Sequence, residues 1–135
     1  MQLNLMRKSD YSIRAMIYVA RRDGDGLSQA RQIAAEMDIP YKFLTRILAN
    51  LVAEGLLEAT RGPSGGYRLA WAATDITLLD VVEAAEGPAT LTRCVLREGP
   101  CDLETPCAVH DTWVRVQSAL ARELASTSLA DLATY

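Results

Sequence analysis

The sequence of 135 residues predicts a mainly α-helical fold with a small β-hairpin: a winged helix-turn-helix followed by a long C-terminal helix. Two short segments with apolar residues at helical spacing are separated by the breaker at 38–40 (Asp-Ile-Pro), as in a helix-turn-helix. The glycine-rich stretch 61–66 lies between two short β-prone segments, which is typical of a hairpin. Residues 108–125 repeat apolar side chains at helical spacing, which predicts a long amphipathic helix.

Composition and charge limit the classes of protein to which the chain can belong. A chain of this length with 50% hydrophobic residues can bury one core. It has no apolar run of about 18 residues and no signal-peptide pattern at its start, so we expect a cytoplasmic protein with no membrane partner. Residues 1–70 carry ten Lys and Arg against seven Asp and Glu, whereas residues 71–135 carry four against ten. The basic half can meet an anionic partner, although so small an imbalance is also ordinary.

Three helices are expected in the first 55 residues. The first is capped by Ser9, the second spans about 29–37 after Ser28, and the third spans about 41–55. The buried stripe of the first helix comprises Ile13, Met16, Ile17 and Ala20. The buried stripe of the third helix comprises Leu44, Ile47, Leu48 and Leu51, and its opposite face carries Lys42, Thr45, Arg46 and Ala49. That opposite face is polar and cationic, which suits contact with DNA.

The next segment predicts a wing. Gly55 suits the position after a helix, and residues 56–60 and 67–70 predict two strands around the tip at 61–66. A DNA major groove of about 12 Å admits a helix, and a wing can enter the flanking minor groove. The expected DNA contacts are Ser28, Tyr41, Lys42, Thr45, Arg46, Arg61, Gly62, Pro63 and Ser64. A solvated helix face and an ordinary hairpin turn are the alternative interpretation.

Further helices are expected after the wing. Thr77, with Asp80 three residues later, is a capping-box variant that starts a helix running to Gly87. The apolar side of this helix comprises Leu78, Leu79, Val82 and Ala85. The long helix at about 108–125 carries a dimerisation stripe of Val109, Trp113, Val116, Leu120 and Leu124. This stripe must be covered by the chain's own domain or by a partner helix, and residues 126–135 predict a short closing helix.

The cysteines are clustered. Cys94, Cys101 and Cys107 fall within fourteen positions, and the only histidine, His110, follows closely. An odd, clustered set in a chain without a signal peptide is a poor disulfide framework and a better metal site. Thiolates and imidazole bind iron-sulfur clusters or zinc, and the long spacings favour a cluster because zinc sites usually contain Cys-x2-Cys pairs. Zinc stays an alternative, as does a set of buried small hydrophobic residues. A cysteine-nucleophile enzyme is not expected, because no orienting group or oxyanion loop is evident.

Four segments together with the cysteine pattern resemble the Rrf-type iron-sulfur transcription regulators, the family that includes IscR-, NsrR- and RirA-like proteins. The segments are SDYSIRAMIYVA (9–20), RGPSGGYRL (61–69), ITLLDVVEAAEG (76–87) and TSLADL (127–132). The resemblance implies a winged helix-turn-helix DNA-binding domain at 1–87, and an iron-sulfur-binding loop (about 92–110) and dimerisation helix (about 108–125) within 88–135. It also implies a homodimer on a palindromic double-stranded DNA operator, acting as a repressor that senses iron or cluster status, redox state or nitric oxide.

The same resemblance implies that Cys94, Cys101 and Cys107 are cluster ligands and leaves two candidates for the fourth. His110 is similar to the histidine of IscR-like members and indicates a 2Fe-2S cluster. Asp10 stands where NsrR-like members place a carboxylate that reaches a 4Fe-4S cluster from the partner subunit. We favour His110, and with it 2Fe-2S, because a ligand close in sequence needs less loop-closure entropy. Thr45 replaces the recognition-helix carboxylate of IscR-like proteins, so their switching between two operator classes is not implied.

Overall fold

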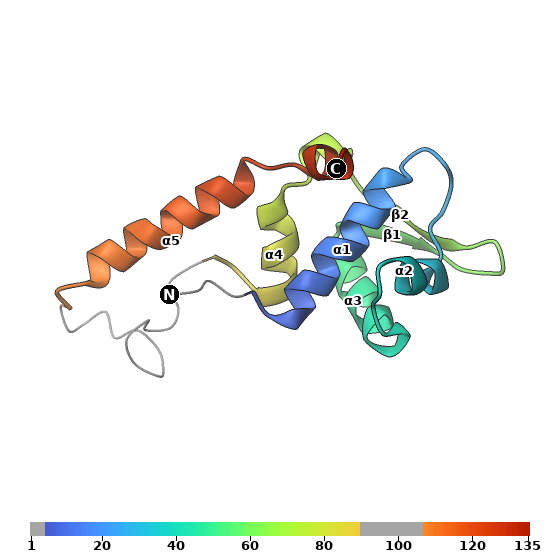
Figure 1. The fold of residues 1–135 in the computed structure, drawn as a ribbon, viewed down its shortest axis with the longest axis horizontal. Helices are drawn as coiled ribbons and strands as arrows, with labels where there is room; N and C mark the ends of the chain where they lie inside the picture. The colour runs from blue at the N-terminus through green and yellow to red at the C-terminus, as the bar shows by residue number, and fades with distance from the viewer. Residues whose placement is uncertain (1–4, 90–106) are drawn as a thin grey trace.

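The computed structural model describes residues 5–89 and 107–135, and its described part is mainly helical with one antiparallel hairpin (Figure 1). The elements are α1 (Arg7–Arg21), α2 (Ala30–Glu36), α3 (Tyr41–Ala53), β1 (Leu57–Thr60), β2 (Gly66–Leu69), a 3-10 turn (Ala73–Asp75), α4 (Leu78–Glu86), α5 (His110–Ala125) and α6 (Leu129–Ala133). This confirms the fold class that the sequence predicts. No described helix has the length and apolar character needed to span a membrane.

Helix α1 lies at the centre of the core, and its start differs from the prediction. It begins at Arg7 with Met6 as the cap residue, so Ser9 lies inside the first turn and does not cap it. Ser9 is fully buried, and its hydroxyl donates to Glu86 at the end of α4. The Ser12 hydroxyl, also buried, donates to the Lys8 carbonyl at 2.7 Å. These small serines let α4 pack closely on α1, which moves the fully buried face away from the predicted Ile13 and Ile17.

The fully buried side of α1 comprises Ser9, Ser12, Ala15, Met16, Tyr18, Val19 and Ala20. Helix α3 packs against it with Leu44, Leu48 and Leu51, all at 0% exposure, whereas the predicted Ile47 is half-buried. Asp38 adopts φ 51° in the turn between α2 and α3, and Ile39 is buried beside it. The structure therefore contains the predicted helix-turn-helix, with α3 ending slightly before the expected Gly55.

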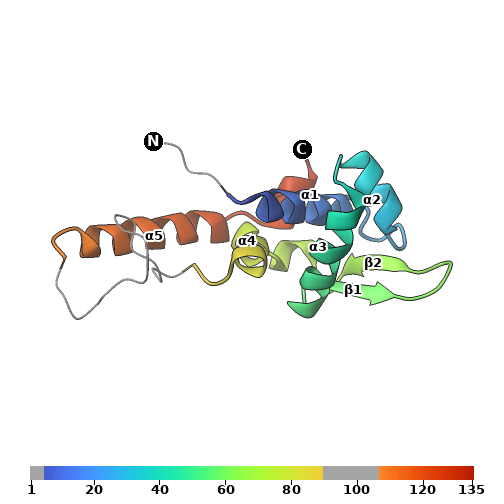
Figure 2. The same ribbon diagram turned by 90° about the horizontal axis from the view of Figure 1, so that it is seen from below.

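The hairpin forms the wing and projects from the body of the molecule (Figure 2). Strands β1 and β2 pair in the register Leu57 with Leu69 to Thr60 with Gly66. Ser28 extends the pairing, since its N–H and carbonyl bond the carbonyl and N–H of Tyr67 at 2.9 and 2.8 Å. The wing is therefore fastened to the segment that leads into α2.

Helices α4 and α6 begin side by side. Thr77 forms the predicted capping box with Asp80, and Ser128 forms a second box with Asp131. The two cap residues also pair through a β-bridge, and Leu129 of α6 is fully buried in the core around α1. On α4 the buried residues are Val81 and Val82, so the predicted apolar side is wrong in part: Leu78 and Leu79 are only half-buried. Helix α4 faces α1, α3 and α5 at once, and this sets its burial.

Candidate nucleic-acid interface and cysteine site

The outer face of α3 is exposed and cationic. Lys42, Thr45 and Arg46 are all exposed, as the helical wheel predicts. The Thr45 hydroxyl donates to the Lys42 carbonyl at 3.0 Å, which leaves its oxygen free to accept. Tyr41, the first residue of α3, is 45% exposed. These side chains lie within the first two turns of the helix, the part of a recognition helix that contacts base edges.

The wing tip adds a second exposed surface. Arg61, Gly62, Pro63 and Ser64 are all exposed, and Gly62 adopts φ 106°. Gly65 closes the tip so tightly that an added Cβ would lie 2.0 Å from the Thr60 carbonyl oxygen. Ser28 does not belong to this surface: it is only 1% exposed, because its backbone pairs with β2.

The charges on these surfaces are not neutralised within the described part of the chain. The ion pairs there involve other cations: Asp10 pairs with Arg14, Glu36 with Arg22 and Glu58 with Arg68. Lys42, Arg46 and Arg61 form no ion pair with any described residue. Free cations around a protruding helix and a wing suit the phosphates of DNA.

Sequence reasoning missed Arg31 on this side of the molecule. It lies in the first turn of α2, is exposed, and has its guanidinium carbon 5.0 Å from the centroid of the Tyr41 ring. The signal available in the sequence was its place at the start of the first helix of a helix-turn-helix, where that helix crosses the DNA backbone.

Two candidate cluster ligands lie together at the start of α5. Cys107 is exposed, and the His110 backbone N–H donates to the Cys107 carbonyl at 3.0 Å, so the two residues belong to the same backbone turn. Cys94 and Cys101 lie outside the described residues. Within the residues that are described, no group of three His, Cys, Asp or Glu side chains could hold a metal ion.

Asp10, the competing candidate, is exposed in the first turn of α1 and pairs with Arg14. Its hydrogen bond raises the pKa of Arg14 above the usual value. Arg14 also donates to the Met37 carbonyl at 2.7 Å, which ties α1 to the turn of the helix-turn-helix. The start of α1, which carries Asp10, and the start of α5, which carries His110, lie well apart in both ribbon views (Figures 1 and 2).

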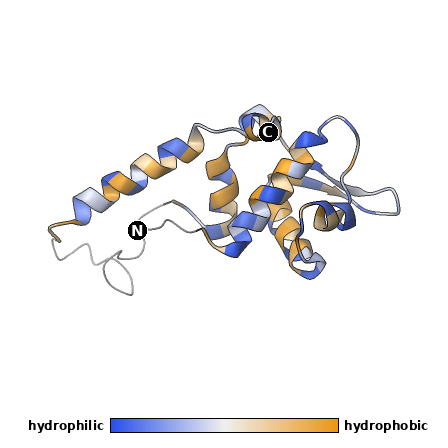
Figure 3. Cartoon of the chain, in the orientation of Figure 1, coloured by the Kyte–Doolittle hydropathy of each residue, from blue (hydrophilic) through white to orange (hydrophobic). Residues whose placement is uncertain are grey.

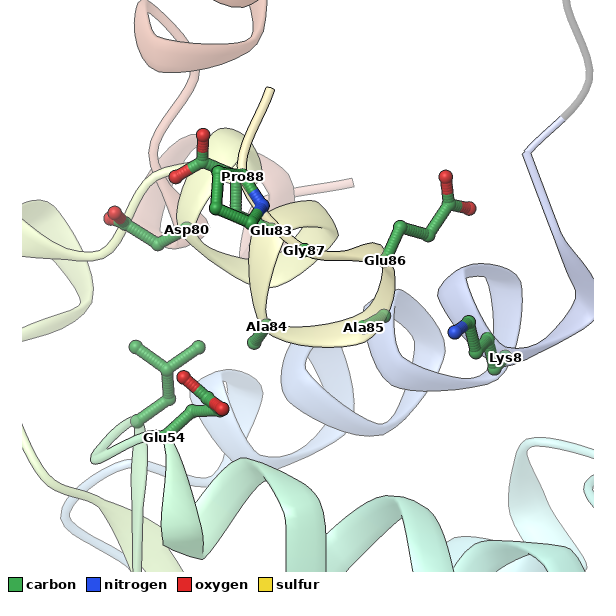
Figure 4. A pocket seen from close by; sticks show the side chains of 10 residues that line it. Lys8, Glu54, Asp80, Glu83, Ala84, Ala85, Glu86, Gly87 and Pro88 are labelled. Carbon is green, nitrogen blue, oxygen red and sulfur yellow. The ribbon is translucent and has the colours of Figure 1, made fainter. Parts of the chain in front are cut away.

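A polar pocket between α4, Lys8 and Glu54 is lined by several carboxylates (Figure 4). These groups already serve the fold. Asp80 caps α4, Glu83 accepts from the Ala89 N–H at 2.8 Å, and Glu86 accepts from the Met6 N–H at 2.9 Å. Three of the four carboxylates that line the pocket therefore bond backbone N–H groups near the ends of α1 and α4.

Helix α5 extends away from the rest of the chain with alternating apolar and polar sides (Figures 1 and 3). None of its residues is buried. Along the predicted stripe, Val109, Val116 and Leu120 are 37%, 49% and 43% exposed, and Trp113 and Leu124 are half-buried. The Trp113 Nε1 atom is buried yet has no hydrogen-bond acceptor among the described residues. Such a stripe is typical of a helix that another surface covers.

A basic helix-turn-helix, a protruding wing and a separate amphipathic helix define a winged-helix DNA-binding protein. The chain belongs to the Rrf2 family, described as iron-dependent transcriptional regulators, whose model matches residues 5–135. Proteins of this family are transcriptional regulators that bind DNA, not enzymes.

Relatives and solved structures agree with this assignment. The chain is 33% identical to the regulator NsrR of Halalkalibacterium halodurans over 133 residues, covering 98% of this chain and 91% of the relative. It is 31% identical to IscR of Photorhabdus laumondii over 130 residues, covering 96% and 79%. Its fold is similar to that of CymR, the global cysteine regulator of Bacillus subtilis, with a TM-score of 0.82, 28% identity and coverage of 99% and 98%. The IscR structure from T. potens gives a TM-score of 0.78 at 26% identity, with coverage of 99% and 88%.

Proposed function

We propose that this chain is a homodimeric repressor whose binding to a palindromic DNA operator depends on an iron-sulfur cluster. Cys94, Cys101 and Cys107 would hold the cluster, with His110 as the fourth ligand and Asp10 of a second chain as the competing one. The cluster would report iron or cluster status, redox state or nitric oxide. The observation that carries the proposal is the backbone turn at the start of α5 that contains both Cys107 and His110.

The donor set suits the cluster. Three thiolates and one imidazole match the ligands of iron-sulfur centres, in which His can replace Cys. Both described donors lie at the end of α5 that is remote from the core, with Cys107 exposed and His110 half-buried. A group held there would join the segment after α4 to the start of α5. This supports a division into a DNA-binding domain at 1–87 and a sensing and dimerisation segment at 88–135.

Binding of the cluster at this junction would affect DNA binding by changing the placement of the two DNA-binding domains of the dimer. Helix α4 contacts α1, α3 and α5, so a change in the placement of α5 would reach α3 through α4 and alter its tilt relative to the partner copy. The cluster itself would be the sensor, because iron shortage, oxidation or reaction with nitric oxide would remove it. A hundredfold change in operator affinity needs a differential binding free energy of about 3 kcal/mol, within the usual range for coupled sites.

The direct test is anaerobic purification followed by absorbance and Mössbauer spectroscopy, with iron and acid-labile sulfide analysis. We expect a brown or red protein with charge-transfer bands. His110→Ala should alter the spectrum and lower the iron content more than Asp10→Ala if histidine is the fourth ligand. The opposite order would transfer that role to Asp10 and favour a 4Fe-4S cluster.

A structural zinc is the alternative, because the same donors bind zinc. It predicts a colourless protein with about one zinc per chain and no sulfide, and that result would exclude the cluster. A second outcome also contradicts the proposal: equal affinity of the cluster-loaded and cluster-free protein for its operator at fixed salt. Since the family includes a protein known as a global cysteine regulator, the fold does not decide the signal, and this comparison is needed.

A further inference from the structure

Three arginines in the described part of the chain stack on tyrosine rings, and one of them differs from the other two. The guanidinium carbons of Arg14 and Arg22 lie 5.1 and 5.0 Å from the ring centroids of Tyr11 and Tyr18. Each of these guanidinium groups is also paired with a carboxylate, Asp10 for Arg14 and Glu36 for Arg22. Each of these two arginines therefore already has a carboxylate partner at the protein surface.

Arg31 has the same stacked geometry without the carboxylate. Its guanidinium carbon lies 5.0 Å from the centroid of the Tyr41 ring, yet it forms no ion pair or hydrogen bond with any residue that the structure describes. Stacking on an aromatic face fixes the plane of a guanidinium group and leaves the N–H donors at its edges unused. Arg31 is thus oriented by the Tyr41 ring, and none of its N–H donors bonds a residue that the structure describes.

The position of the pair says what it can bind. Tyr41 is the first residue of α3 and precedes Lys42, while Arg31 lies in the first turn of α2. In a helix-turn-helix the first helix crosses the DNA backbone where the second enters the major groove. Planar, forked donors match phosphate oxygens, so an unpaired and oriented guanidinium at this place suits a backbone phosphate.

We infer that Arg31 is a phosphate-binding residue of the DNA interface, held in position by Tyr41. Tyr41 then acts as a positioning residue rather than as a base contact. This inference rests on the DNA-binding surface described above and does not depend on an iron-sulfur cluster. It adds α2 to the interface of α3 and the wing.

The test is fluorescence anisotropy with a labelled, mixed-sequence DNA duplex of about 30 base pairs, roughly three helical turns. Affinity is measured between about 50 and 200 mM salt, because each phosphate contact contributes about 0.9 to the slope of log K against log salt. Arg31→Ala should lower the affinity roughly tenfold at low salt and reduce the slope by about 0.9 per chain. Arg31→Lys should keep the slope with an intermediate affinity, because it keeps the charge and loses the planar fork.

Substitutions of Tyr41 distinguish the positioning of Arg31 from the effect of its charge. Tyr41→Phe should behave as wild type, whereas Tyr41→Ala should lower the affinity and keep the salt slope, since Arg31 is then charged but no longer held. The matched control is Arg22→Ala, which removes a stacked arginine that is already paired with Glu36. We expect this control to leave both affinity and slope unchanged.

Each other outcome contradicts the inference. An unchanged slope and affinity for Arg31→Ala would exclude a phosphate contact. A lower affinity at an unchanged slope, with a lower thermal midpoint, would assign Arg31 a structural role. If Lys42→Ala weakens binding and Arg31→Ala does not, only this inference fails. If the wild-type protein does not bind the duplex, the assignment of α3 and the wing as a DNA-binding surface is contradicted as well.

Discussion

Individual side chains determine where α4 and α6 begin, and they do so as one cluster. Thr77 accepts from the Asp80 N–H at 3.1 Å and donates its own N–H to the Asp80 carboxylate at 2.8 Å. Ser128 and Asp131 repeat this arrangement, and their hydrogen bonds lower the pKa of Asp131. Backbone bonds of 2.8 Å from Leu78 to Thr127 and from Leu129 to Ile76 join the two caps. The caps therefore attach the C-terminal end of the chain to the DNA-binding body.

Loss of the Thr77 hydroxyl should destabilise the protein measurably. Thr77→Ala removes the acceptor for the Asp80 N–H, and loss of an N-cap costs about 1 kcal/mol. We expect the free energy of unfolding, measured in urea, to fall by roughly that amount. Thr74→Ala is the matched control, because Thr74 is exposed and forms no hydrogen bond with a described residue. Equal unfolding midpoints for the two variants would contradict the role of the cap.

The residue scale also shows why some side chains could be predicted and others not. Thr77 and Asp80 are three residues apart, so their capping box is readable from the sequence alone. The partner of Ser9 is Glu86, which is 77 positions away, and only the packing of α4 on α1 brings them together. That Arg31 pairs with no carboxylate among the described residues also depends on the fold, since Asp and Glu are frequent nearby in the sequence.

At the scale of elements, local patterns predict best where each element has one buried side. Helix α3 is packed on one face, and its predicted cationic face is exposed as expected. Helix α4 contacts three other helices, so a single apolar stripe does not describe it, and Val81 was missed. Helix α6 is predicted by its composition, but its return to the core around α1 is a tertiary contact that the sequence does not reveal.

The tip of the wing has no room for a side chain at Gly65. An alanine Cβ at Gly65 would lie 2.0 Å from the Thr60 carbonyl oxygen and 2.9 Å from the Arg61 carbonyl carbon, so the tip would have to open. Gly65→Ala should lower the free energy of unfolding by about 1–3 kcal/mol, as overpacking does, and weaken DNA binding because Arg61 is displaced. Urea unfolding and anisotropy measure the two effects. Ser64→Ala, one residue earlier and exposed, should change stability by less than about 0.5 kcal/mol.

At the scale of the whole molecule, the chain consists of a packed body and one projecting helix. The core around α1 includes residues from α2, α3, the wing, α4 and α6, whereas α5 buries none of its own. The body could be predicted in outline because its stripes and turns are local. What covers α5 could not, since a stripe on one chain does not identify its partner. The chain must meet a second surface to remove this stripe from water.

A second copy of the chain is the partner that we propose, and the most exposed stripe residue tests it. In a twofold interface each substitution occurs twice, and an unpaired buried charge costs roughly 3–5 kcal/mol. Val116→Asp should therefore convert the protein to a monomer in sedimentation measurements. It should also weaken operator binding, because a monomer has one DNA-binding domain where the dimer has two. The helix content should not change, since Val116 is 49% exposed within its own chain. Ser118→Asp adds the same charge on the polar side of α5 and should stay dimeric. A Val116→Asp protein that sediments as the wild type does would refute dimerisation through α5.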